Sequence, residues 1–288
     1  MEEKAKTVLY LNLEKRQAVS KIHTDLISWV GGLGLALKLL EQNPEGSPLI
    51  LAVGPLTAAF PFMAKTAAVF RSPYDRQLRE TYIGGKFGAL LTFSGLDAIV
   101  FTGKARRSCF ITVEDDKIDF RTVNNETPLW LGGGLAGRSS VLSPIDGQLT
   151  ADTYFHFSEP ETTEVFVGKN LQALILSGHR AIPINDRRPY ESLYTGLLNQ
   201  AGNLPVGPGP GPSCFGCPLG CAAATAGEGP KTNFLAASLV SCQFARDLYG
   251  DVPRIFTCLE ALGKTYHHED LESLSGRMEI LRKKLENA

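Results

Sequence analysis

Short apolar runs recur through roughly the first 180 residues and predict β-strands. They are rich in β-branched and aromatic residues, which favours strands over helices. The clearest runs are Thr7–Leu13, Leu49–Val53, Ala98–Thr102, Cys109–Val113 and Ala173–Ser177. The polar segment Glu114–Lys117 directly follows one of them and is typical of a hairpin turn. One early helix is expected over Asp25–Val30 and Leu35–Glu41, across a glycine-rich stretch.

Near Arg187 the apolar residues change to helical spacing. Pro189–Gln200 places its leucines on one side of a helix. Residues 204–212 alternate proline and glycine so densely that regular structure is excluded. Three further helices are expected, over Asn233–Tyr249, Val252–Leu262 and Leu271–Asn287. The sequence therefore predicts an α+β protein, with a β-rich domain at 1–186 and a small helical region at 187–288.

Composition and charge exclude several classes of protein. The chain has 288 residues, 43% of them hydrophobic and 20% charged, which is ordinary for a globular protein. Its formal net charge is −1 and it has no basic stripe, so no nucleic-acid partner is expected. No apolar run approaches the roughly 18 residues that a membrane span needs. The charged N-terminus lacks the apolar core of a signal peptide, so a cytoplasmic protein is expected.

Three of the six cysteines form a C-x2-C-x3-C motif at Cys214, Cys217 and Cys221. Cytosolic thiols are kept reduced, so this spacing indicates a metal site rather than disulfides. Glycine and proline keep the loop irregular, so its N–H groups can point at sulfur, as [4Fe–4S] sites require. The fourth thiolate of such a cluster would be Cys242 or Cys258. A structural zinc site and three unligated thiols are the alternatives, although zinc ribbons usually contain a second C-x2-C pair.

Two other motifs suggest chemistry that their surroundings do not support. Residues 132–137 satisfy G-x-G-x-x-G, but no strand precedes them and no good helix follows, as a dinucleotide site would need. His267–Asp270 could suggest a metal site. Because it lies where a helix is expected to begin, we interpret its acidic residues as favourable partners of the helix dipole.

Several segments, in order, resemble those of the tungsten-dependent aldehyde ferredoxin oxidoreductases. Two early segments match W-x-G-x-x-G-L-A and L-I-x-A-x-G-P-L-T, and the cysteine motif matches C-x2-C-P-x-G-C. The matching segments are Trp29–Ala36, Leu49–Thr57, Arg71–Pro73, Gly84–Gly88, Gly95–Val100, Val167–Ala173 and Cys214–Cys221. Ordered matches of this kind are more specific than any single motif.

The resemblance implies a fold and cofactors. In that family the N-terminal domain has two β-sheets, a tungsten bis-pterin lies between it and two helical domains, and a nearby [4Fe–4S] cluster passes electrons to ferredoxin. Family members are anaerobic enzymes and much longer, and both large helical domains are almost wholly missing here. The family's fourth cluster cysteine comes shortly before its C-terminal segment, which favours Cys242 over Cys258. We therefore expect the cluster on Cys214, Cys217, Cys221 and Cys242.

The chain departs from the family where the pterin is held. It has no D-x-x-G-L motif, and Lys65 falls where a family arginine reaches the cofactor. Asn233 falls where the family has an acid, so no catalytic residue is predicted. Lys65, Gly84 and Gly85 are the candidate residues of a vestigial surface that would contact a pterin. A tungsten or molybdenum pterin ranks below the cluster as a cofactor.

These observations predict an electron-transfer protein. It would act as a carrier or as a subunit of an oxidoreductase, with a ferredoxin-like protein or a larger oxidoreductase subunit as redox partner, in a homo- or hetero-oligomer. One alternative is an accessory or assembly module that covers the tungsto- or molybdopterin of a partner enzyme. A third hypothesis is a reduced oxidoreductase with one bound metallopterin; a self-sufficient aldehyde oxidoreductase is not expected.

Overall fold

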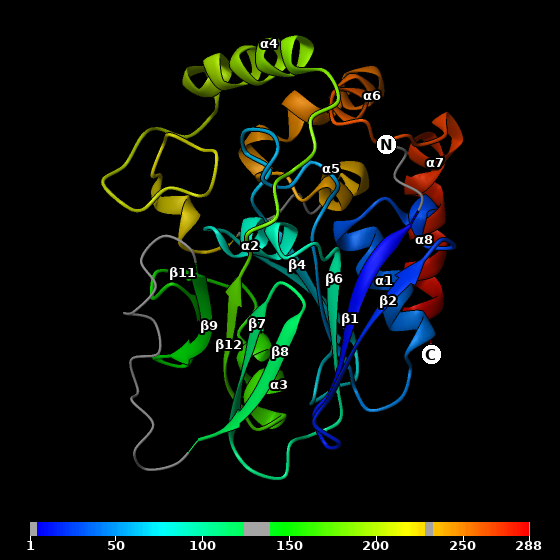
Figure 1. The fold of residues 1–288 in the computed structure, drawn as a ribbon, viewed down its shortest axis with the longest axis vertical. Coiled ribbons are helices and arrows are strands. Elements are labelled where there is room, and N and C mark those ends of the chain that lie inside the picture. The colour runs from blue at the N-terminus through cyan, green and yellow to red at the C-terminus, as the bar shows by residue number, and fades with distance from the viewer. Residues whose placement is uncertain (1–4, 124–138, 228–232, 288) are drawn as a thin grey trace.

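The computed structural model describes residues 5–123, 139–227 and 233–287 (Figure 1). Their strands form two six-stranded mixed sheets. The first has the order β2-β1-β6-β3-β4-β5, and the second β11-β10-β9-β12-β7-β8. The strands of the first sheet are β1 (Lys6–Asn12), β2 (Gln17–His23), β3 (Leu49–Ala52), β4 (Thr66–Arg71), β5 (Leu78–Ile83) and β6 (Ala98–Thr102). Those of the second are β7 (Cys109–Glu114), β8 (Lys117–Thr122), β9 (Ser139–Ile145), β10 (Gln148–Ala151), β11 (Phe155–His156) and β12 (Leu171–Ser177).

The central strands β3, β4 and β6 of the first sheet are buried on both faces, which explains why they look like continuous apolar runs, whereas the edge strand β2 is largely exposed. In β1, Val8 packs into a core against helices, whereas Leu9 packs into the core between the two sheets. Successive strand residues point to opposite faces, so each face needs its own apolar set. β3 accordingly contains four buried apolar residues in a row. The expected α+β class with two β-sheets is confirmed.

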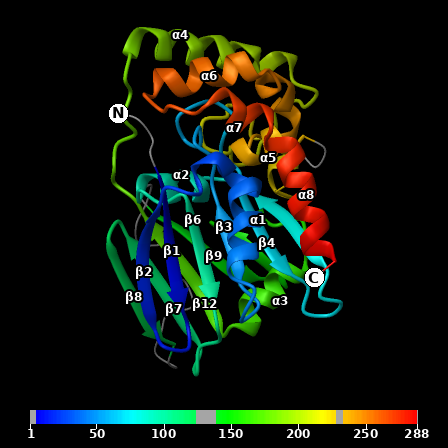
Figure 2. The same cartoon turned by 90° about the vertical axis from the view of Figure 1, so that its right-hand side faces the viewer.

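Helices cover the outer face and one end of this body (Figure 2). α1 and α8 contact each other along the first sheet, and α4 and α6 lie across the end of the body that also holds α5. The helices are α1 (Gly32–Gln42), α2 (Phe87–Phe93), α3 (Glu161–Gly168), α4 (Arg187–Leu198), α5 (Phe234–Leu239), α6 (Val252–Ala261), α7 (His268–Glu272) and α8 (Leu274–Glu286). Residues of α1 and of the C-terminal helices share one hydrophobic core with the first sheet. The β-rich and the helical parts of the chain therefore pack against each other in one core. The domain boundary expected at residue 186 stays a prediction.

Most expected elements are present, and three helices differ from expectation. The early helix expected across the glycine-rich stretch is interrupted, because a 3₁₀ turn covers Ile27–Trp29 and α1 begins at Gly32. The five strands predicted from the apolar runs are β1, β3, β6, β7 and β12, and the expected hairpin turn joins β7 to β8. The expected helix over Asn233–Tyr249 is wrong: α5 ends at Leu239 and a 3₁₀ helix begins at Gln243. The expected last helix is divided at Ser273 into α7 and α8. The structure adds seven strands and two helices, α2 and α3, that short or mixed patterns did not reveal.

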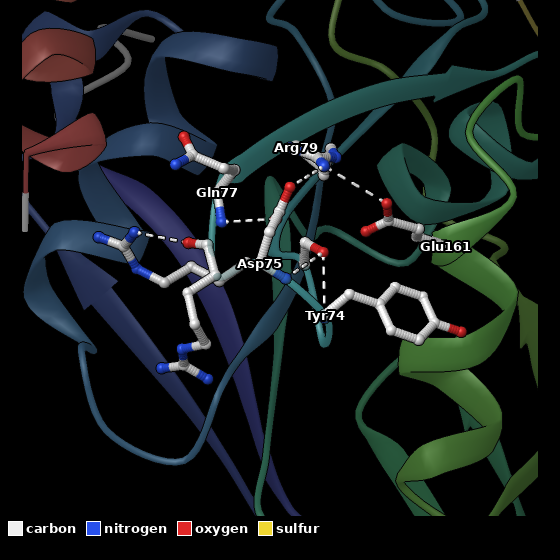
Figure 3. Close-up of polar contacts among 8 residues, drawn as sticks. Tyr74, Asp75, Gln77, Arg79 and Glu161 are labelled. Carbon is white, nitrogen blue, oxygen red and sulfur yellow. Dashed lines mark hydrogen bonds and ion pairs between the residues drawn. The ribbon is translucent and has the colours of Figure 1, made fainter.

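An ion-pair network joins the two sheets beside the β4–β5 turn (Figure 3). Arg79 on β5 contacts Asp75 in the turn over 2.8 Å and Glu161, the first residue of α3, over 3.4 Å. Thr81 of the same strand also lies 3.1 Å from the hydroxyl of Ser158, just before α3. Asp75 and Glu161 are therefore already paired with Arg79.

The remaining sequence expectations have mixed outcomes. The G-x-G-x-x-G match at 132–137 lies outside the described residues. At the start of α7, the Asp270 carboxylate accepts a hydrogen bond from the His267 backbone N–H over 3.2 Å, so the helix-start interpretation of this segment is confirmed. No helix within the described ranges is long and apolar enough to span a bilayer.

Candidate metal centre

Four cysteines from two distant parts of the chain line one small pocket. Cys214, Cys217 and Cys221 come from the loop before α5, and Cys242 comes from the segment after it. Phe62, Lys65 and Phe244 are among the other residues in the wall. We call this the thiol pocket. The four cysteines that the sequence analysis selected are therefore brought together.

The loop that carries the first three thiols is held by contacts with the chain just after β5 and with α2. The Phe215 N–H donates to the Gly85 carbonyl over 3.0 Å, and the Phe215 ring packs edge-on against Phe93 of α2. Gly220 has a φ of 52°, and a Cβ there would lie 2.4 Å from the Gly211 carbonyl oxygen. Only glycine fits this position without strain, so the loop can turn tightly between its thiols.

Cys242 reaches the pocket because the helix before it stops early. Val240 adopts left-handed backbone angles, with φ 57°, directly after α5. Its carbonyl accepts the Lys65 N–H over 3.2 Å, and the Cys242 N–H donates to the Phe62 carbonyl over 2.9 Å. The chain is thus tied to residues 62–65 of the β-body, and the Cys242 side chain faces the other three thiols. A continuous helix, as the sequence predicted, would not permit these contacts.

Backbone N–H groups point at three of the four sulfur atoms. Gly85 donates to the Cys214 Sγ over 3.4 Å. The Leu219 N–H donates to Cys217, and the Phe244 N–H donates to Cys242. Hydrogen bonds of this kind favour the thiolate and are a feature of protein sites that hold iron–sulfur clusters.

Lys65 supplies a positive charge in the same wall. Its side chain is 3% exposed, and within the described part of the chain its ammonium group has no hydrogen bond or ion pair to an oxygen atom. Its charge lowers the pKa of Cys242, against the larger effect of burial, which raises it. A Cβ on Gly84 would lie 2.8 Å from the Cys214 Sγ and 3.3 Å from the Lys65 Nζ. The absence of a side chain at Gly84 therefore lets the thiol and the ammonium approach the end of β5.

Burial opposes ionisation of two of these thiols by raising the pKa of Cys217 and of Cys242. It raises the pKa of Cys217 to about 11, so the thiolate needs a compensating positive charge. A bound metal provides that charge and binds with release of the thiol protons. Cys258 behaves differently: it lies on α6 in the hydrophobic core, fully buried, where burial raises its pKa to about 12.

The candidate pterin residues lie at this pocket or beside it. Lys65 lines the pocket, and Gly84 adjoins it. The backbone of Gly85 is covered by the Phe155 ring, because a Cβ there would lie 2.5 Å from that ring. The sequence analysis missed Phe62 and Phe244, which are lining residues without a motif. Among the described residues, no three Cys, His, Asp or Glu side chains are arranged to hold a single metal ion.

Comparisons with known proteins agree with the fold. Residues 8–140 match the profile of the aldehyde ferredoxin oxidoreductase N-terminal domain. The tungsten-containing aldehyde ferredoxin oxidoreductase of Pyrococcus furiosus is 28% identical over 206 residues, which cover 63% of this chain and 34% of that enzyme. Its counterpart from Thermococcus kodakarensis is 26% identical over 206 residues, which again cover 63% of this chain and 34% of that enzyme. The WOR-like subunit of the aliphatic sulfonate oxidoreductase of P. furiosus is 25% identical over 170 residues, covering 55% of this chain and 27% of that subunit.

Among solved structures, the active-site complex BamBC of benzoyl coenzyme A reductase has the same fold. Its TM-score is 0.63 at 17% identity, and the match covers 98% of this chain and 63% of that one. The alignment with the curated aldehyde ferredoxin oxidoreductases spans about a third of their length.

Proposed function

We propose that this chain, whose residues 8–140 match the aldehyde ferredoxin oxidoreductase N-terminal domain, is an iron–sulfur electron-transfer protein related to those oxidoreductases. It would hold one [4Fe–4S] cluster on Cys214, Cys217, Cys221 and Cys242. The convergence of these four thiols on one pocket is the observation that carries the proposal. When bound, such a cluster accepts and donates single electrons.

The residues around the thiols suit a negatively charged, sulfur-rich group. Three backbone N–H groups donate to sulfur, and the buried Lys65 ammonium lies in the same wall. Both features stabilise negative charge on thiolates and on the cluster they hold. Phe62 and Phe244 exclude water from one side, which strengthens these electrostatic interactions.

We infer a role as a subunit or carrier in electron transfer. The aligned part of the chain corresponds to about a third of the tungsten-containing relatives, and the sequence contains no D-x-x-G-L motif of the kind with which that family holds its pterin. One relative is named as a subunit, and the structural neighbour belongs to a complex; both support a multi-subunit assembly. Its redox partner would be a ferredoxin-like protein or a larger oxidoreductase subunit.

The alternative function, covering a partner's metallopterin, receives less support. It would use the Gly84–Gly85 backbone as a flat face, but Phe155 already covers Gly85, and Cys214 lies against Gly84. A reduced oxidoreductase with its own metallopterin would need the same face.

Metal analysis of the anaerobically purified protein tests the proposal. We expect about four irons and four acid-labile sulfides per chain, without tungsten or molybdenum. The reduced protein should show the paramagnetic resonance spectrum of a [4Fe–4S] cluster. Zinc without iron would instead establish a structural zinc site, and stoichiometric tungsten or molybdenum would establish the metallopterin alternative.

A further inference from the structure

A second pocket, far from the thiols, is lined by four cationic side chains. Arg71 is the last residue of β4, Arg76 lies in the β4–β5 turn, Lys104 follows β6, and Lys169 follows α3. Its volume is about 460 Å³, and we call it the basic pocket. It lies at the opposite end of β4 from Lys65, and that six-residue strand spans about 20 Å. It is therefore separate from the thiol pocket.

The cations of the basic pocket lack acidic partners. Within the described parts of the chain, none of the four forms an ion pair with a carboxylate. The nearby Asp75 and Glu161 both form ion pairs with Arg79 instead (Figure 3). One carboxylate, Glu164, lines the pocket, and it accepts a hydrogen bond from the Tyr74 hydroxyl. Four positive charges thus face one negative charge in a protein whose formal net charge is −1.

Hydrogen bonds to neutral oxygen atoms hold the two arginine side chains in place without using all of their donors. Arg71 donates to the carbonyls of Arg76 and Leu285, over 3.1 and 2.8 Å. Arg76 donates to the Ser47 hydroxyl over 2.9 Å. Because a guanidinium group has five N–H donors, each arginine keeps several for a ligand. Fixed guanidinium groups with free donors suit the paired oxygens of phosphate.

Lys169 is the buried member of the set. It is 5% exposed, and its ammonium donates to the Ser47 carbonyl over 2.7 Å and to the Gly46 and Gly103 carbonyls at 3.4 Å. These acceptors are neutral, so no counter-charge offsets the burial of the ammonium. An anion in the pocket would supply it.

We propose that the basic pocket binds a small phosphate-bearing molecule with more than one negative charge. The concave shape and the limited volume favour a small ligand, because a nucleic acid would need an extended basic surface. A phosphate group places up to two negative charges on three oxygens of one compact group, whereas a carboxylate group carries only one negative charge, so phosphate suits cations gathered around one pocket better. This proposal is independent of the iron–sulfur function.

Calorimetric titration of the full-length, cluster-loaded protein with inorganic pyrophosphate tests the proposal. We expect one site per chain, and citrate should bind more weakly. Arg76→Gln and Lys104→Gln remove exposed cations of the pocket, and each should weaken pyrophosphate binding about tenfold. Arg187→Gln and Lys21→Gln are the matched controls on α4 and β2, and they should bind as the wild type does.

Circular dichroism and iron content would verify that each variant is folded and loaded. Three results would overturn the proposal: no measurable pyrophosphate binding, equal loss of affinity in the control variants, or citrate binding as tight as pyrophosphate binding. The first two would show that there is no specific anion site. The third would show that the pocket does not select phosphate.

Discussion

The backbone N–H of Gly85 donates a hydrogen bond to the sulfur of Cys214 over 3.4 Å. This contact joins the end of β5 to a loop almost 130 residues later in the chain. It depends on the preceding residue, Gly84, because any side chain there would occupy the position of the same sulfur. The β-body therefore forms part of the wall of the thiol pocket and also stabilises the charge on one of its thiols.

Substituting Gly84 should weaken cluster binding without unfolding the protein. In Gly84→Ala the new Cβ would lie 2.8 Å from the Cys214 Sγ, so the thiol must move. We expect iron and sulfide content to fall well below that of the wild type after identical anaerobic purification. Gly196→Ala on α4 is the control, since a Cβ there meets nothing within 4 Å. Full iron content in Gly84→Ala would contradict our view of this contact.

Cys242 and Cys258 should respond differently to the same substitution. Cys242→Ala removes one of the four thiols of the pocket, so the [4Fe–4S] spectrum should be lost or converted to that of a three-iron cluster. Cys258→Ala removes a core thiol and should lower the free energy of unfolding by about 1 kcal/mol while leaving the iron content unchanged. The reverse pattern would assign the fourth ligand to Cys258.

Replacing Lys65 by methionine should lower the reduction potential of the bound cluster. Reduction adds a negative charge, which the buried ammonium stabilises, so its removal disfavours the reduced state. We expect an effect on the order of 1 kcal/mol, about 40 mV for a one-electron couple. A redox titration followed by paramagnetic resonance measures this shift, and Lys65→Arg should restore most of it. An unchanged potential in Lys65→Met would show that the ammonium does not interact with the cluster.

The buried ammonium of Lys169 should make stability depend on pH. Burial lowers its pKa from 10.5 to about 8, so between these values the unfolded chain binds a proton that the folded chain lacks. The free energy of unfolding of the wild type, relative to Lys169→Met, should therefore rise with pH by about 1.4 kcal/mol per unit over this range. Glu164, Arg71, Arg76 and Lys104 line the same pocket and are present in both proteins, so their contributions largely cancel.

Urea denaturation of both proteins at several pH values, in buffers without polyanions, measures this difference. A difference that stays constant with pH would show that Lys169 keeps its proton. Added pyrophosphate should shift the rise to higher pH, because a bound anion favours the charged ammonium.

Local features of the sequence were sufficient to predict the α+β class, five strands and three thiols of the pocket. The apolar runs form strands whose two faces are both buried at the centre of the first sheet, as the four buried residues of β3 illustrate. The spacing of Cys214, Cys217 and Cys221 places these thiols in one short loop, so their proximity is a local property of the chain.

The tertiary structure determined which other groups join those thiols. From the residues alone, Cys242 and Cys258 were equivalent candidates, and the helical pattern of Asn233–Tyr249 concealed the break at Val240. That break is stabilised by contacts with Phe62 and Lys65, which lie far away in sequence. The basic pocket likewise combines cations from three separate connections. Spacing describes neighbours along the chain, whereas these sites depend on packing between distant segments, which overrides local preference.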